Sequence, residues 1–90
     1  MEVHEDQEFA YVYFMSGNPE EIGEAVPGHI RYWEDLRLEG YRGGPFADRS
    51  GGMIVFTAVD EDQAKRIVAG DPFVERGVVG ESWLKAWRAE

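Results

Sequence analysis

The sequence contains no cysteine, which excludes disulfides, thiolate nucleophiles and thiolate metal sites together. The absence is consistent with a reducing compartment, and we expect a cytoplasmic protein. Basic side chains are also scarce, with 9 Lys and Arg against 18 Asp and Glu, so the formal net charge is -9. This charge repels phosphate backbones and anionic membrane surfaces unless Lys and Arg cluster, and they do not. We therefore expect neither a nucleic acid nor a membrane as partner.

Long apolar runs are missing as well, since none approaches the ~20 residues that a membrane-spanning helix needs. The acidic residues 1–8 have no apolar core and do not resemble a signal peptide. A chain of 90 residues forms one small domain. We expect a loosely ordered acidic extension over residues 1–8 and a single domain over residues 9–90.

Two segments, residues 9–15 and 53–59, are rich in aromatic and β-branched side chains and predict strands. Both are apolar at nearly every position, which is typical of strands buried on both faces, and we place 53–59 centrally. Residues 41–47 predict a short extended segment, and residues 82–87 alternate as a final strand. A bend is expected shortly before this final strand, at residues 77–80.

Two helices are predicted between these strands. The first runs over residues 28–39, with Pro27 in its first turn, an apolar stripe at helical spacing, and Gly40 as its stop. The second follows Asp60, a capping residue, and ends at Gly70. The segment 71–73 then leaves that helix.

The resulting order, βαββαβ, predicts an α+β ferredoxin-like fold with an antiparallel sheet and both helices on one face. The other face of the sheet would be bare, although its strands are apolar on both sides. A second copy covers such a face most simply, so we predict a homodimer formed through the sheet face.

From residue 28 onward the sequence resembles the YCII-related domain family, whose fold is a dimeric α/β barrel. Each short motif is weak alone, and the resemblance depends on their order along most of the chain. The motifs are Gly28-His29, Leu36 with Glu39-Gly40, Gly44-Pro45, Gly52, Phe56, Ala64, Asp71-Pro72-Phe73, Gly77-Val78, and Lys85 with Trp87.

The resemblance implies a conserved histidine and aspartate pair, proposed in the family as an active site, at His29 and Asp71. One branch of the family is similar to an enzyme that eliminates chloride from chlorinated hydroxyhydroquinones, whereas other members serve as accessory domains. This chain departs from the family at Ala86, where many members have proline. It departs again at Trp83, where smaller residues are common and where the change bears on the pocket or the dimer surface.

The residues themselves leave two readings open for each member of this pair. His29 falls in the first turn of the predicted helix, where the macrodipole disfavours the imidazolium and favours a neutral base, or it only caps and packs there. Asp71 forms an Asx-turn before Pro72, or its carboxylate bonds one ring nitrogen of His29 and fixes the tautomer.

Other candidate motifs receive less weight. Gly43-Gly44-Pro45 is read as turn geometry because no Lys-Ser/Thr follows to make a phosphate loop, and Arg42 beside it either attracts an anionic substrate or is a solvated strand residue. Ser82 has no nucleophile-elbow pattern around it. The aromatic residues line a pocket or, more commonly, form core and dimer interface; they are Tyr11, Tyr13, Trp33, Phe46, Trp83 and Trp87.

We therefore expect a lyase or isomerase without cofactor or metal, in which His29 and Asp71 transfer a proton on a small organic molecule, aromatic or carbonyl-containing. The alternatives are a ligand-binding or accessory domain that performs no chemistry, and a purely structural dimerisation module.

Overall fold

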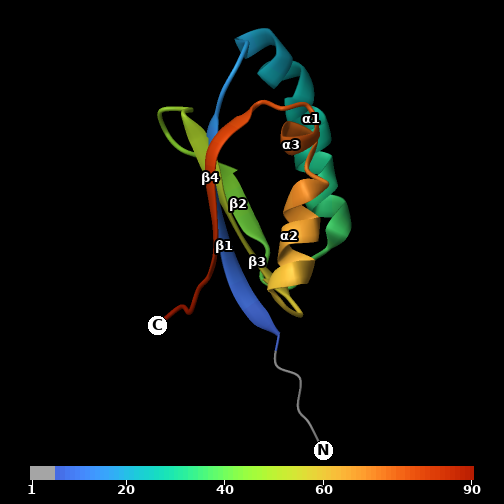
Figure 1. Ribbon diagram of the computed structural model, residues 1–90, viewed down its shortest axis with the longest axis vertical. Helices are drawn as coiled ribbons and strands as arrows, with labels where there is room; N and C mark the ends of the chain where they lie inside the picture. The colour runs from blue at the N-terminus through green and yellow to red at the C-terminus, as the bar shows by residue number, and fades with distance from the viewer. Residues whose placement is uncertain (1–5) are drawn as a thin grey trace, which may run out of the picture.

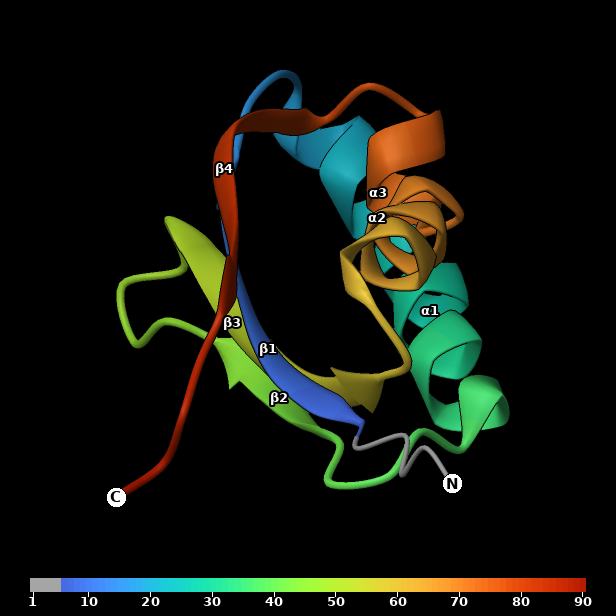
Figure 2. The ribbon, with the colours of Figure 1, turned by 60° about the horizontal axis from the view of Figure 1, so that its bottom comes forward.

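A computed structural model describes residues 6–90 of the chain, which fold into a sheet layer and a helix layer (Figures 1 and 2). The sheet has four strands, β1 (Gln7–Met15), β2 (Arg42–Pro45), β3 (Gly51–Ala58) and β4 (Val79–Ala86). The helix layer contains α1 (Pro19–Leu36), α2 (Glu61–Ala69) and the short α3 (Pro72–Glu75).

The strands lie in the order β2-β3-β1-β4, and every neighbouring pair is antiparallel. This arrangement confirms the predicted α+β ferredoxin-like fold, with β3 and β1 in the centre of the sheet. The helix α3 is an addition that the sequence analysis did not predict. Figure 2 shows the three helices on one face of the sheet.

Alternate residues of the central strands form the core between the two layers. Phe9, Tyr11 and Tyr13 of β1 point toward the helices, as do Ile54 and Phe56 of β3, and all five are at most 3% exposed. Trp33 of α1 fills the space above them and is completely buried. Because successive side chains of a strand alternate between faces, the residues between these positions point away from the helices.

The first helix begins nine residues earlier than predicted. Asn18 is its N-cap and accepts a hydrogen bond from the backbone N–H of Glu20 at 2.7 Å, and Pro19 occupies the first helical position. Pro27, which we had placed in the first turn, lies inside the helix. The end was also wrong, because the helix stops at Leu36 with Arg37 in the left-handed region (φ 50°) rather than at Gly40.

The other boundaries differ less. Helix α2 is capped by Asp60, which accepts from the N–H of Gln63 at 2.8 Å, and it ends before Gly70 as predicted. The strand β4 starts at Val79, so the predicted bend extends only to residue 78. The strand β1 starts at Gln7, within the extension predicted over residues 1–8, and residues 1–5 of that extension lie outside the described residues.

Helices cover only one side of the sheet, and the opposite face carries large apolar side chains. Trp83 and Trp87 are 46% and 36% exposed there, and the ring of Phe14 meets the Trp83 ring at a centroid distance of 5.9 Å. We call this surface the open face. Of the helices within residues 6–90, none combines the length and apolar character needed to span a membrane.

Candidate functional site

His29 lies in the middle of α1, ten residues after Pro19, and its side chain points into the interface between helix and sheet. It shares a buried stripe with Ala25 and Trp33, four residues before and after it. The predicted position in the first helical turn is therefore wrong. The helix macrodipole acts within the first and last turns, so it does not explain the protonation state of this imidazole.

Asp71 precedes α3 and is that helix's N-cap. One carboxylate oxygen accepts a hydrogen bond from the backbone N–H of Phe73 at 2.8 Å, which is the local turn bond anticipated for an Asp-Pro sequence. The side chain is fully buried, so every acceptor site on it needs a donor from the protein.

The structure brings the His29 ring and the Asp71 carboxylate into direct contact. Nδ1 of His29 lies 2.8 Å from Oδ1 and 2.9 Å from Oδ2 of Asp71. An ionised carboxylate can only accept hydrogen bonds, so Nδ1 carries the proton in this pair. Nε2 is then the ring nitrogen with a free lone pair.

A third donor reaches the same carboxylate from the indole of Trp33, whose Nε1 lies 2.9 Å from Oδ2 of Asp71. Trp33 is one helical turn beyond His29, so both residues face Asp71 from the same side of α1. Trp33 was expected in the core or in a pocket wall, and its bond to Asp71 was not predicted. Its spacing of four residues from His29 was the signal available.

The free nitrogen of His29 faces a tyrosine on the sheet. The Tyr13 hydroxyl lies 3.4 Å from Nε2, and a Cβ added at Gly52, on the neighbouring strand, would collide with that hydroxyl. Burial raises the pKa of Tyr13 to about 12, with the Asp71 charge as a second cause. Tyr13 therefore stays protonated at neutral pH and can donate to Nε2.

A cavity of about 460 Å³ opens beside the imidazole, between α1 and the edge strand β2. Phe73 stacks on the His29 ring with a centroid distance of 4.0 Å and, together with Ile54, forms part of an apolar wall. A Cβ at Gly43 would lie 2.8 Å from a side-chain carbon of Ile54, so glycine is needed there for β2 to approach β3 closely. The other residues that line the cavity are Val26, Ile30, Glu34, Tyr41, Gly44, Pro45 and Arg49.

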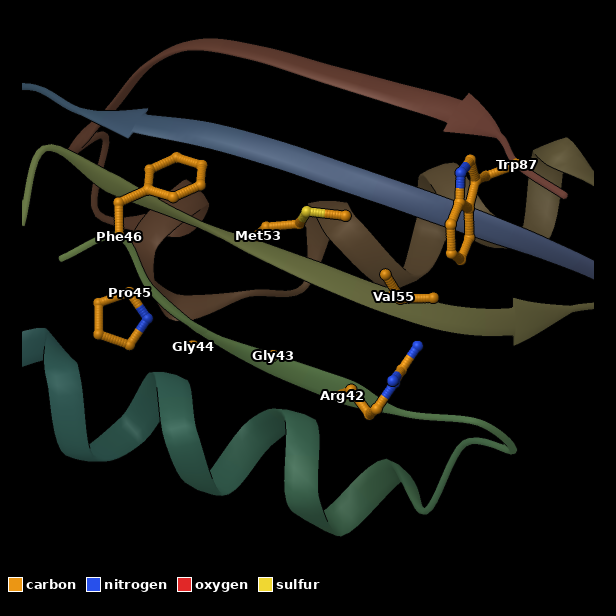
Figure 3. Close-up of a pocket in the computed structure, with 8 residues that line it drawn as sticks. All are labelled: Arg42, Gly43, Gly44, Pro45, Phe46, Met53, Val55 and Trp87. Atoms are coloured by element: carbon orange, nitrogen blue, oxygen red, sulfur yellow. The ribbon is translucent and has the colours of Figure 1, made fainter. Parts of the chain in front are cut away.

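A second hollow, of about 400 Å³, lies on the open face and shares Gly43, Gly44 and Pro45 with the first. Figure 3 shows Met53, Val55 and Trp87 across its strands. Gly43–Pro45 lie in a strand, which agrees with the extended segment predicted over residues 41–47 and not with turn geometry at these residues. Arg42 is exposed on that strand and lines this second hollow, away from His29.

Metal ligands do not gather at either hollow in the described part of the chain. Within residues 6–90 no group of three or more His, Cys, Asp and Glu side chains has the arrangement of a metal site. The Asp71 carboxylate already accepts hydrogen bonds from three donors, Nδ1 of His29, Nε1 of Trp33 and the N–H of Phe73.

The antiparallel four-stranded sheet with its helices on one face defines the class, an α+β protein of ferredoxin-like fold. The YCII-related domain family model matches residues 4–88. The chain belongs to this family. No curated protein matches the sequence.

Solved structures share the fold at low sequence identity. The 5-chloro-2-hydroxyhydroquinone dehydrochlorinase TftG from Burkholderia phenoliruptrix AC1100, in complex with 2,5-dihydroxybenzoquinone, has a TM-score of 0.73 and 19% identity over 91% of this chain and 95% of that one. A conserved protein from Methanosarcina mazei Go1 has a TM-score of 0.56 and 16% identity over 93% and 94%. SnoaB, a cofactor-independent oxygenase from Streptomyces nogalater, has a TM-score of 0.50 and 17% identity over 94% and 95%.

Proposed function

We propose that the protein is a cofactor-independent enzyme of lyase or isomerase type, in which His29 and Asp71 transfer a proton on a small ring compound. The observation that carries this proposal is the buried pair itself, because Asp71 fixes the proton on Nδ1 and leaves Nε2 as the base. A neutral imidazole held in one tautomer beside an apolar cavity is suited to abstracting and returning a proton.

The three donors to Asp71 give this carboxylate an orienting role. A carboxylate bonded by Trp33 and by the Phe73 backbone cannot rotate without losing one of those bonds. The imidazole that it holds is therefore fixed relative to the cavity, as proton transfer requires. When Nε2 accepts a proton, Asp71 stabilises the resulting imidazolium, and the Tyr13 hydroxyl must turn away from Nε2.

The substrate class follows from the cavity and from a relative. A volume of about 460 Å³ with mostly apolar walls has room for a small ring compound. The dehydrochlorinase TftG shares the fold and was solved with 2,5-dihydroxybenzoquinone, which makes 5-chloro-2-hydroxyhydroquinone a rational first compound to assay.

The test is turnover by the wild type and by His29→Ala in a screen of chlorinated and enolisable ring compounds that begins with this one, with chloride release or absorbance as the signal. Loss of the base is expected to lower the rate at least ~100-fold. Arg31→Ala, at an exposed position on the same helix, is the matched control and should retain the wild-type rate. Equal turnover by wild type and His29→Ala would leave His29 with only a ligand-binding or structural role.

We also propose that two copies associate through their open faces. Apolar side chains of β1, β3 and β4 make this surface continuous, and Phe14 joins the Trp83 and Phe46 rings at centroid distances of 5.9 and 5.8 Å. A face of this kind can pair with its own copy about a twofold axis, which buries Trp83 and Trp87 together. We place such a homodimer in the cytoplasm, since the sequence has no cysteine.

A further inference from the structure

The cavity beside His29 carries opposite charges at its two ends. Val26 and Glu34 both line it from α1 and are eight residues apart, a rise of about 12 Å along the helix. Tyr41 and Pro45 line it from the opposite side and are separated by about 13 Å of extended chain. Figure 3 shows the later turns of α1 near Arg42 and the earlier ones near Pro45. Glu34 and Tyr41 therefore mark one end.

Arg49 marks the other end. It follows Pro45 in the turn between β2 and β3, where its backbone N–H bonds the carbonyl of Phe46 at 2.9 Å. Among the lining residues it is the one with a permanent positive charge. No ion pair within residues 6–90 involves it, so its guanidinium is available to a ligand.

We propose that the cavity selects a hydroxylated ring compound that bears an anionic group, with the anion held by Arg49, the hydroxyl directed to Glu34 and Tyr41, and the ring beside His29. This deepens the proposed function and rests on it. The anionic group is a carboxylate or a phenolate, because a guanidinium binds both through charge-assisted hydrogen bonds.

The backbone at Arg49 is held in place by the turn between β2 and β3. Its φ is 64°, in the left-handed region that glycine or asparagine occupies at less cost. The turn is closed by Asp48, whose carboxylate accepts from the N–H of Ser50 at 3.0 Å and from its hydroxyl at 2.7 Å. This turn fixes the Arg49 backbone at the end of the cavity.

The opposite end favours a neutral donor over an anion. Burial raises the pKa of Tyr41, with the Glu34 charge as the second cause, so Tyr41 is a protonated hydroxyl at neutral pH. The Glu34 carboxylate repels a second anion and accepts a hydrogen bond from a hydroxyl group. The two ends thus give a bound ligand one orientation.

The test is equilibrium binding by calorimetry, with 4-hydroxybenzoate as the anionic probe and 4-hydroxybenzamide as its neutral counterpart. Wild type is expected to bind the acid more tightly than the amide. Arg49→Gln should weaken binding of the acid by about 10- to 100-fold, which is the usual contribution of a hydrogen bond to a charged group. Binding of the amide should be unchanged. Arg42→Gln, the same change on the same hairpin but in the other hollow, should bind the acid as wild type does.

Three results would overturn the role of Arg49: no measurable binding of 4-hydroxybenzoate at millimolar concentration, equal binding of acid and amide, or equal losses in Arg49→Gln and Arg42→Gln. Benzoate tests the hydroxyl end, since it should bind wild type more weakly than 4-hydroxybenzoate, and this difference should shrink in Glu34→Ala. Equal affinity of the two acids in wild type would overturn the proposed binding of the hydroxyl by Glu34 and Tyr41. None of these results bears on turnover, which His29→Ala tests separately.

Discussion

The two hollows of this protein lie on either side of the same three residues, Gly43, Gly44 and Pro45, yet they differ in chemistry. The cavity on the helix side contains His29 beside a fully buried aspartate, and tyrosines whose pKa values are raised by burial surround that pair. The hollow on the open face contains Trp87, Met53 and Val55, with Arg42 as its charged residue.

This difference separates two uses of one short edge strand. The helix side keeps polar groups at fixed distances in a water-poor setting, where hydrogen bonds are strong and chemistry is possible. The open side offers apolar area with few fixed polar contacts, which suits association with another surface. Changes on the helix side are therefore expected to lower stability and activity, whereas changes on the open side are expected to weaken assembly.

The largest effect is expected from Asp71→Ala. The substitution leaves three donors without their acceptor, the His29 ring, the Trp33 indole and the Phe73 backbone, in a site without solvent. Each unsatisfied buried donor costs about 1 to 3 kcal/mol, so the loss of the three bonds should cost about 3 kcal/mol or more, a large share of the stability of a small domain. Urea denaturation followed by tryptophan fluorescence measures this loss.

The control is Asp48→Ala, because the Asp48 carboxylate also closes a turn but lies exposed to solvent. Its loss should cost far less than that of Asp71, since water replaces the missing partner. Equal costs for the two substitutions would show that the buried network around Asp71 has no special importance for stability.

An intermediate effect is expected on the open face from Trp83→Glu. A glutamate buried in the proposed dimer interface should weaken association at least ~30-fold, since interface tryptophans can contribute about 2 kcal/mol or more. Light scattering at micromolar concentration should then give a monomer mass, with the unfolding midpoint of the monomer little changed. Ile30→Glu, a change at an exposed apolar position on α1 and therefore on the helix side of the sheet, should remain dimeric. A monomeric wild type would contradict the interface.

The sequence was sufficient to predict the layout of the sheet. The apolar strands around residues 9–15 and 53–59 and the capping residue Asp60 gave the correct order of elements, because strand patterns and caps are local signals. The first helix was misjudged because Asn18-Pro19 ends a strand and starts a helix equally well. The pair Glu20-Glu21, acidic residues in the first turn, was the local signal that favoured the helix.

The candidate site depended on contacts that no local pattern encodes. His29 and Asp71 are 42 positions apart, and they were linked through a resemblance to a family rather than through their spacing. The bond from Trp33 to the same carboxylate, and the cavity between α1 and β2, arise only when the helix packs on the sheet. Arg49 reaches that cavity from a hairpin turn, so no local pattern groups it with His29.

The smallest effect is expected from Tyr13, and it concerns how the stability of the protein depends on pH. This dependence should change with Tyr13 on the helix side and not with Trp83 on the open face. Its pKa is about 12 in the folded protein against 10.0 for an exposed tyrosine, so folded and unfolded chains hold the same proton below pH 10. Between pH 10 and 12 the unfolded chain loses that proton first, and stability must fall with rising pH, by at most about 1.4 kcal/mol per pH unit for one tyrosine.

Tyr13→Phe removes this contribution and should make the loss of stability between pH 10 and 12 shallower. Tyr11 retains its own contribution, since burial raises its pKa as well, so the slope should decrease without vanishing. Urea denaturation at intervals of half a pH unit measures the change, and Trp83→Glu on the open face should leave the wild-type slope per chain intact. Identical slopes for wild type and Tyr13→Phe would mean that Tyr13 ionises as readily in the folded chain as in water, and that its hydroxyl is not held beside Nε2 of His29.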